Sequence, residues 1–386
     1  MPSAPVQPHQ RIQYLDVVRG FAITGVLLAY VFWNLGTAPE STYTSFDRGL
    51  DKTLLFLIDS KCFTLLANLF AVGFVLHMNK SDNPARSLYT YRRRLTGLMI
   101  IGLLHALLLR NGDILLPYAL LTLLVSFFYT ASNRTIIIAM AVTFFLQVFV
   151  PEIWKWLHIP FPQRPVTNGN YWMDNFGWVK FWYASAIFYW ETTLFFLFAG
   201  LLLGRVFIQN KKKLGNKQIL FIAVTGLVSG SAGYWILSYY TNEISALPDI
   251  GNTQIIKRTV FNLLWLIHRG GLASAYASLF YLLLKNFKLK TLAALGRTSL
   301  TNYILQAVIV VPVCFLFNLF DHITPTIALI MTASIWIIQV LFSNWWLKHY
   351  RFGPLEWLLR RFTYGKTLTA KKMESETELV AVAETM

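Results

Sequence analysis

The sequence has few charged residues and almost no cysteine. Only 13% of its 386 residues are Asp, Glu, Lys or Arg, whereas a soluble domain carries about 25%. Apolar residues make up 55% of the chain, and aromatic residues alone make up 16%. No hydrophilic stretch is long enough to form a soluble domain of ordinary size. The composition therefore excludes a set of globular modules and predicts an all-α, polytopic transmembrane helix bundle.

Other features that the sequence lacks exclude further classes of protein. The two cysteines, Cys62 and Cys314, lie within apolar segments, so the sequence offers no disulfide framework. It has no glycine-rich phosphate loop, no Gly-x-Ser-x-Gly motif and no paired-cysteine zinc spacing. We predict no metal site, because the histidines lack ligand spacing. The first apolar run is too long for a cleavable signal peptide, and we interpret it as a retained transmembrane helix.

The apolar surplus falls into segments about as long as a membrane-spanning helix, which takes about 20 residues. We predict ten such helices, over residues 17–35, 53–77, 95–109, 114–129, 135–150, 181–208, 218–240, 259–284, 300–320 and 323–347. Together they form a single membrane-embedded bundle, residues 1–386. Its parts are five helices in 15–150, an outer aromatic loop at 151–180, five helices in 181–347 and a cytoplasmic tail at 348–386.

The net charge of +16 is distributed over alternate loops. Basic residues fill the loops around 80–94, 205–217 and 285–297 and the tail, whereas the opposite loops are acidic or mixed. The positive-inside rule then places both termini in the cytoplasm. The basic loops are expected to face the lipid bilayer's anionic headgroups. No basic domain is present to bind nucleic acid.

The outer loop contains four tryptophans, Trp154, Trp156, Trp172 and Trp178. Such residues commonly form an aromatic belt at the membrane interface. A long ordered loop can also be functional, here as a lid over a site. Both interpretations stay open.

Charged and polar residues at membrane depth are costly and need a reason. Asp16 and Arg19 are three residues apart, on one helix face, where the chain enters the first span. They form either a functional pair or a structural ion pair. Further candidates lie in later spans: Lys61, Glu191, His268, Arg269, Asn302 and Gln306. A polar seam of this kind suits an enzyme site or a transport path equally well.

His105 is the most specific candidate. Its leucine-rich surroundings favour the neutral ring. A neutral imidazole can accept a proton from an attacking hydroxyl or amine, or attack an acyl group itself. Gly102, one turn earlier, leaves room for another chain or a ligand. The alternative is a histidine that only bonds to a neighbouring helix.

Five motifs, in order, resemble those of the YeiB-like bacterial membrane proteins, a family of unknown function within the transmembrane acyltransferase superfamily. They are LDVVRGFA at 15–22, KCFTL at 61–65, GLLH with GDIL between 102 and 115, GRTSLTNY at 296–303 and GPLEW at 353–357. The resemblance covers nearly the whole chain.

The resemblance implies transfer of an acyl group, commonly acetyl, from cytoplasmic acyl-CoA to a sugar-like or other small-molecule acceptor. The polyanionic donor would then bind at cytoplasmic arginines, namely Arg19, Arg92, Arg93 and Arg94. In one branch of the superfamily, the arginine that Arg19 matches is followed eleven residues later by the catalytic histidine. This sequence has Tyr30 there. His105 is its natural replacement, with Asp113 as the second catalytic candidate.

Two other functions stay open. One is a transporter or exporter, for which Gly270-Gly271 could break a span near mid-membrane. The other is a non-catalytic membrane component. Glu356 lies past the last span among arginines, so we predict that it docks the tail rather than acts in a site.

Overall fold

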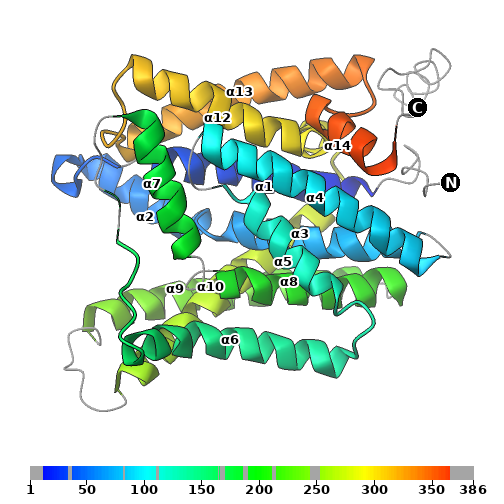
Figure 1. The fold of residues 1–386 in the computed structure, drawn as a ribbon, viewed down its shortest axis with the longest axis horizontal. Coiled ribbons are helices and arrows are strands. Elements are labelled where there is room, and N and C mark those ends of the chain that lie inside the picture. The colour runs from blue at the N-terminus through cyan, green and yellow to red at the C-terminus, as the bar shows by residue number, and fades with distance from the viewer. Residues whose placement is uncertain are drawn as a thin grey trace.

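The computed structural model describes residues 12–33, 37–80, 83–109, 113–163, 165, 170–185, 190–210, 214–243 and 253–365. Within these residues the fold is all-α, as predicted, and most helices run along the long axis of one bundle (Figure 1). The helices are α1 (Gln13–Trp33), α2 (Ser45–Leu57), α3 (Lys61–Met78), α4 (Pro84–Leu108), α5 (Leu115–Ser126), α6 (Asn133–Trp156), α7 (Tyr171–Ala184), α8 (Trp190–Gly204), α9 (Asn216–Glu243), α10 (Thr253–Leu283), α11 (Lys290–Arg297), α12 (Ser299–Leu316), α13 (Pro325–His349) and α14 (Pro354–Tyr364).

Several helices begin at residues whose side chains satisfy the first free backbone N–H groups. Asn83 accepts from the backbone N–H of Arg86, and Pro84 occupies the first position of α4. Thr324 and Pro325 repeat this arrangement at the start of α13. Capping oxygens and a proline in the first turn both favour helix initiation, so these boundaries are set locally.

Among the described residues, seven segments are long and apolar enough to cross a membrane: α1, α2 with α3, α6, α8, α9, α12 and α13. Their outward faces are also apolar. Ile137, Phe221, Val228 and Leu341 are all more than half exposed. A bilayer would cover such a surface, whereas water would make it an aggregation hazard. The chain is a multi-pass membrane protein.

Three other predicted spans correspond to helices that contain charged residues, α4 and α10, or are short, α5. The described part of α4 begins with a basic stretch, and α10 contains Lys257, Arg258, His268 and Arg269. Helix α5 has only 12 residues. At about 1.5 Å per residue it is about 18 Å long, less than the hydrocarbon thickness of about 30 Å.

Two of the predicted spans are not single continuous helices. The span at 53–77 is divided between α2 and α3, because Ser60 has the left-handed backbone angle φ of 60°. The span at 181–208 begins inside α7, which ends at Ala184, and continues in α8 from Trp190. The predicted outer loop is also partly helical, since it contains the end of α6 and most of α7.

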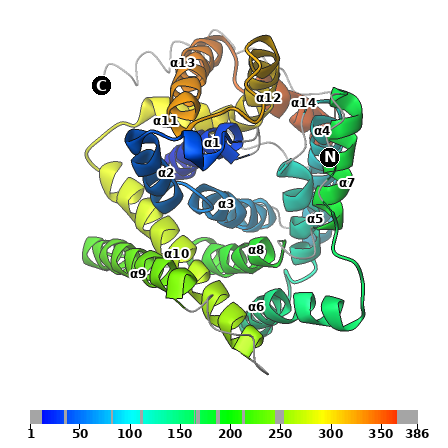
Figure 2. The same ribbon diagram turned by 90° about the vertical axis from the view of Figure 1, so that its left-hand side faces the viewer.

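The predicted break at Gly270-Gly271 is wrong. Helix α10 continues through both residues, from Thr253 to Leu283. Gly271 lies against the backbone of Gly226 and Gly230 in α9. Small residues allow two membrane helices to approach closely. Gly271 therefore allows close packing of α9 and α10, which lie side by side in Figure 2.

Glycines also bring α1 and α11 together. A Cβ atom on Gly20 would overlap the carbonyl oxygen of Leu292, and one on Gly296 would overlap that of Asp16. Gly20 belongs to the first motif of the sequence and Gly296 to the fourth. The two motifs therefore meet at one backbone-to-backbone contact.

Helix α14 is docked by Glu356, as predicted. Oε1 accepts from the backbone N–H groups of Leu300 and Thr301, at 2.6 and 3.1 Å, and Oε2 accepts from the Thr301 hydroxyl at 2.6 Å. The carboxyl group thus caps the first turn of α12. Burial raises the pKa of Glu356, whereas these hydrogen bonds act in the opposite direction.

Replacing Glu356 by alanine is expected to destabilise the protein by about 1.5–3 kcal/mol, because a hydrogen-bonded carboxylate is lost and the start of α12 is left uncapped. The midpoint of thermal unfolding in detergent measures this loss. Glu356→Gln keeps one acceptor oxygen and should lie between wild type and the alanine variant. A wild-type midpoint in Glu356→Ala would contradict the docking role.

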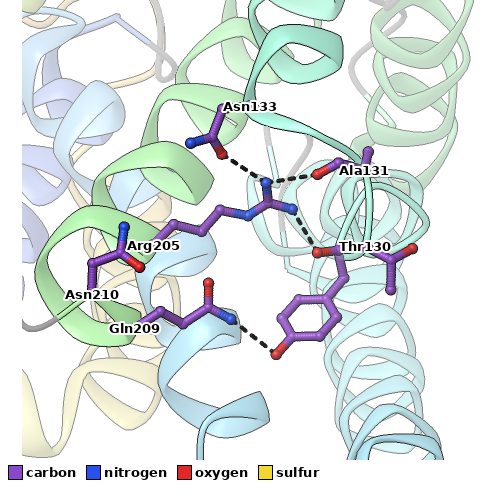
Figure 3. A pocket seen from close by; sticks show the side chains of 7 residues that line it. Thr130, Ala131, Asn133, Arg205, Gln209 and Asn210 are labelled. Atoms are coloured by element: carbon purple, nitrogen blue, oxygen red, sulfur yellow. Dashed lines mark hydrogen bonds between the residues drawn. The ribbon is translucent and has the colours of Figure 1, made fainter.

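Arg205 lies in a predicted basic loop, but its side chain is buried in the π-helical turn that extends α8. The guanidinium donates to backbone oxygens at the α5–α6 connection and to Asn133 Oδ1 (Figure 3). Gln209 donates to the hydroxyl of Tyr129 at 3.2 Å. These groups line a polar pocket of about 220 Å³. Arg205 thus fastens α8 to the α5–α6 connection and is not a free loop charge.

Candidate active site

The centre of the candidate site is the contact between the end of α4 and the start of α5. Gly102, one turn before His105, lies against the first residues of α5. A Cβ atom there would be 2.6 Å from Oδ2 of Asp113 and 2.6 Å from the backbone nitrogen of Leu116. The absence of a side chain at residue 102 therefore allows Asp113 to reach His105, and the room predicted at Gly102 is used by another part of the same chain.

His105 and Asp113 form a buried pair. Nδ1 of His105 lies 3.1 Å from Oδ1 of Asp113, and the two side chains are 1% and 0% exposed. The two atoms are within hydrogen-bonding distance, but the ring is not oriented for Nδ1–H to donate to the carboxylate. Catalytic hydrogen bonds are often poorly aligned without substrate and tighten in its complex.

The carboxylate of Asp113 is itself held in place. Oδ2 accepts from the backbone N–H of Leu116 at 2.7 Å, and Oδ1 accepts from the hydroxyl of Tyr303 at 3.0 Å. The same hydroxyl accepts from the backbone N–H of Ile114 at 3.0 Å. The Tyr303 ring lies 4.9 Å from that of His105. Tyr303, from α12, therefore fixes both members of the pair.

Helix α7 covers the end of α4. Nδ2 of Asn175 donates to the carbonyl oxygens of Ala106 and Leu107, at 2.9 and 3.1 Å. These carbonyls lie in the last turn of α4, where no further intrahelical donor is available. Figure 1 shows α7 crossing the end of α4. The helical part of the predicted outer loop thus lies next to the site, as a lid would.

Tyr30 lies beside the same cluster. Its side chain is buried, and it is close enough to Tyr303 for the two hydroxyls to interact electrostatically. This is the position at which the predicted superfamily resemblance implies a histidine in one branch. The end of α1 and the end of α4 therefore converge on one region of the bundle.

A histidine beside an anchored carboxylate is suited to proton transfer. The carboxylate orients the ring and stabilises the imidazolium that forms when Nε2 takes a proton. The low polarity of the surroundings strengthens both effects. The arrangement can therefore activate a hydroxyl or amine nucleophile.

The four arginines predicted to bind acyl-CoA make different contacts. Arg19 lies 3.4 Å from Oδ1 of Asp16, in the ion pair that the spacing indicates. Arg93 donates to the carbonyl oxygen of Phe362 in α14 at 2.7 Å. The guanidinium of Arg92 lies 4.8 Å from the ring centroid of Phe127, and Arg94 is exposed. Arg93 therefore also contributes to docking of the tail.

Asn302 and Gln306 are buried in helix contacts. Asn302 donates to the hydroxyls of Thr298 and Ser343, both at 3.0 Å, which joins α12 to α13. Gln306 donates to the carbonyl oxygen of Ile23 in α1 at 3.3 Å. These satisfied contacts hold α12 in the bundle and place Tyr303, one residue after Asn302, at the His105–Asp113 pair.

The remaining predicted residues lie elsewhere in the bundle. Lys61, His268 and Arg269 gather near the break between α2 and α3. Glu191 is buried at the start of α8, and its Oε2 has no hydrogen-bond partner among the described residues. Among the residues that the structure describes, no group of three or more His, Cys, Asp and Glu could hold a metal ion.

Sequence reasoning missed two residues of the site. Tyr303 is the last residue of the fourth motif, so its position in the motif was the available signal. Asn175 lies in a segment predicted as a loop and had no such signal. Both act through contacts between segments far apart in the chain, which a single sequence does not display.

Gly102→Ala is expected to displace α5 and misplace Asp113. Overpacking of this kind costs about 1–3 kcal/mol, and a shift of about 1 Å at a catalytic group can cost about 10²-fold in rate. Thermal unfolding and turnover of the purified variant measure the two effects. Gly73→Ala is the matched control, because a Cβ atom there has nothing within 4 Å. Equal behaviour of the two variants would argue against the close contact.

Comparison with known proteins finds one family model and several relatives to which the chain is similar. Residues 203–366 match the family described as "Protein of unknown function (DUF418)". The chain is 26% identical to "Uncharacterized protein YxaH" of Bacillus subtilis (strain 168), over 93% of this chain and 96% of the relative. It is also 26% identical to "Uncharacterized protein YeiB" of Escherichia coli (strain K12), over 90% of this chain and 95% of the relative. The chain is YeiB-like. The predicted resemblance to YeiB-like proteins is confirmed, and the place in the acyltransferase superfamily stays a prediction.

Proposed function

We propose that this YeiB-like protein is an integral membrane acyltransferase. It moves an acyl group, commonly acetyl, from cytoplasmic acyl-CoA to a sugar-like or other small acceptor at or across the membrane. The observation that supports the proposal is the buried His105–Asp113 pair, with its carboxylate held by Tyr303 and the start of α5.

In the proposed reaction, Nε2 of His105 takes the proton from the acceptor's hydroxyl group. The acceptor oxygen then forms a bond to the thioester carbon, and the carbon–sulfur bond breaks. The CoA thiolate leaves and receives the proton from His105. Asp113 keeps the ring oriented and stabilises its cationic form.

The proposed topology brings donor and acceptor from opposite sides. The chain crosses a bacterial inner membrane ten times, through the seven apolar segments, α4, α10 and the predicted span 114–129 that contains the short helix α5, with both termini in the cytoplasm. The distribution of basic residues supports this orientation. In Figure 1, the start of α1 and helix α14 lie at the same end of the bundle. Arg19 and Arg92–Arg94 would attract acyl-CoA there, and the acceptor would enter near Asp113 and α7.

Oriented, sealed liposomes test the proposal. The purified protein is supplied with acetyl-labelled CoA on the side of its termini and with a mixture of sugars inside. An acyltransferase forms a covalently labelled sugar and free CoA. Label that stays on CoA in a folded, correctly oriented sample would contradict the proposal.

Transport of a small molecule is the second candidate, and one observation favours it. The segment Ser45–Met78 counts as one membrane span but is interrupted at Ser60. Transporters commonly bind substrate at interrupted helices near the middle of the membrane. The same liposomes separate the two functions, because a transporter moves unmodified solute in the absence of acyl-CoA.

A further inference from the structure

A second group of ionisable residues surrounds the break between α2 and α3. Asp59 and Lys61 flank Ser60, and α10 contributes His268 and Arg269. The hydroxyl of Tyr276 in α10 donates to the carbonyl oxygen of Leu57 at 2.8 Å, and the ring centroids of Phe56 and His268 lie 5.9 Å apart. These contacts bring α10 against the break.

With both basic side chains protonated, the charges of this group do not balance. Lys61 interacts electrostatically with Asp59 and Arg269, and Asp59 is the acid that the two cations share among the described residues. Lys61 is fully buried, and its Nζ donates to the carbonyl oxygen of Leu55 at 2.6 Å. Uncompensated charge inside a bundle is costly. The group therefore favours one additional negative charge.

The start of α3 adds further positive potential. Ser60 occupies the cap position of this 18-residue helix, but its side chain makes no capping hydrogen bond. Its hydroxyl donates instead to the carbonyl oxygen of Asp59. Free N–H groups and the helix dipole make an uncapped helix N-terminus attractive to anions.

His268 provides an independent sign of a ligand. The residue is 0% exposed, and Nδ1 lies 2.8 Å from the carbonyl oxygen of Gly230 in α9. That acceptor places a proton on Nδ1 and leaves Nε2 of the neutral ring as an acceptor. Nε2 is buried and has no hydrogen-bond partner among the described residues. Phe56 stacks on the face of the His268 ring, with 22° between the ring planes, and the ring is close enough to Lys61 to interact with it electrostatically.

Arg269 also has a buried polar atom without a hydrogen-bond partner among the described residues. Its guanidinium lies 4.7 Å from the ring centroid of Trp265, and its Nε is buried without a hydrogen-bond partner within the described ranges. Two neighbouring residues of α10 thus leave polar atoms unsatisfied beside Lys61 and the start of α3. Buried polar atoms of this kind are rare and need an explanation.

We propose that Lys61, Arg269, His268 and the N-terminus of α3 form a binding site for the oxyanion group of a small molecule or lipid. The oxyanion is a carboxylate or a phosphate that compensates the two cations. A hydroxyl of the same ligand, or a protonated phosphate oxygen, donates to Nε2 of His268. The site goes beyond the proposed function and does not depend on it, because it uses neither His105 nor Asp113.

Ligand-induced stabilisation tests this site without any activity assay. The protein is placed in phosphatidylcholine nanodiscs, and its unfolding midpoint is measured with sodium phosphate, sodium acetate or sodium chloride at equal ionic strength. Phosphate or acetate is expected to raise the midpoint saturably, relative to chloride, because ligands that bind the folded state stabilise it. The more effective anion identifies the group. A rise that needs added phosphatidylglycerol instead assigns the group to a lipid phosphate.

Variants connect the response to the named residues. Lys61→Met and Arg269→Met should lose the rise, and His268→Phe should weaken it. Arg258→Gln, on the same helix but paired with Glu152 outside the site, should keep it. If the methionine variants do not fold, Lys61→Arg and Arg269→Lys keep the charge and should respond with reduced affinity. No rise in folded wild type with any of these anions, or an unchanged affinity in the site variants, would overturn the proposal.

Discussion

Replacing His105 by alanine, Asp113 by asparagine, or both residues together is expected to reduce acyl transfer to a common level, about 10²–10⁴-fold below wild type. General acid–base catalysis contributes about this much. Because Asp113 acts through the histidine ring, removing it should add little once His105 is gone. Turnover of the three variants in liposomes, compared as a double-mutant cycle, measures this coupling.

His77→Gln is the matched control for this cycle. His77 is another membrane-embedded histidine, in α3, and its Nε2 contacts the carbonyl oxygen of Ser87 at 3.1 Å. Its variant should turn over at the wild-type rate. Additive losses in the double variant would mean that His105 and Asp113 act separately, and an equal loss in His77→Gln would show that the effect is structural.

Replacing Gly20 or Gly296 by valine is expected to abolish recovery of folded protein. At both positions a Cβ atom would overlap a backbone carbonyl oxygen of the neighbouring helix, so α1 and α11 would have to separate. This contact involves the start of α1. The valine side chain would meet backbone atoms, which cannot move aside as the end of a flexible side chain can. Yield of monodisperse protein after detergent extraction measures the effect.

Gly49→Val in α2 is the control for both substitutions, because a Cβ atom there has nothing within 4 Å. Its yield should stay close to that of wild type. Normal yield of Gly20→Val and Gly296→Val would contradict the close contact between α1 and α11. Loss at all three positions would point to a general effect of valine.

Composition and periodic apolar runs were sufficient to predict the helical membrane bundle. They could not predict that Ser60 divides a span, because a serine between apolar residues carries no distinct signal for a left-handed backbone angle. They also suggested a break at Gly270-Gly271, where glycine instead allows close packing against α9. Glycine has both uses in membrane helices, and only the neighbouring helix distinguishes them.

Part of the candidate site followed from the sequence. His105, Gly102 and Asp113 belong to one motif, and the structure brings all three together. Tyr303 and Asn175 come from other regions, 190 and 62 positions after Asp113, so their role required the packed fold. The role of acyl-CoA and the place in the acyltransferase superfamily stay predictions, because they rest on resemblance rather than on contacts.

The most direct test of the central claim is turnover of acetyl-labelled CoA in liposomes by wild type and His105→Ala, measured side by side with a proof of folding for each. The proposed mechanism predicts that wild type releases CoA and labels an acceptor, whereas the folded variant does neither. Equal turnover by the two proteins, or no turnover by folded wild type with any acceptor, would contradict an acyltransferase centred on His105 and Asp113.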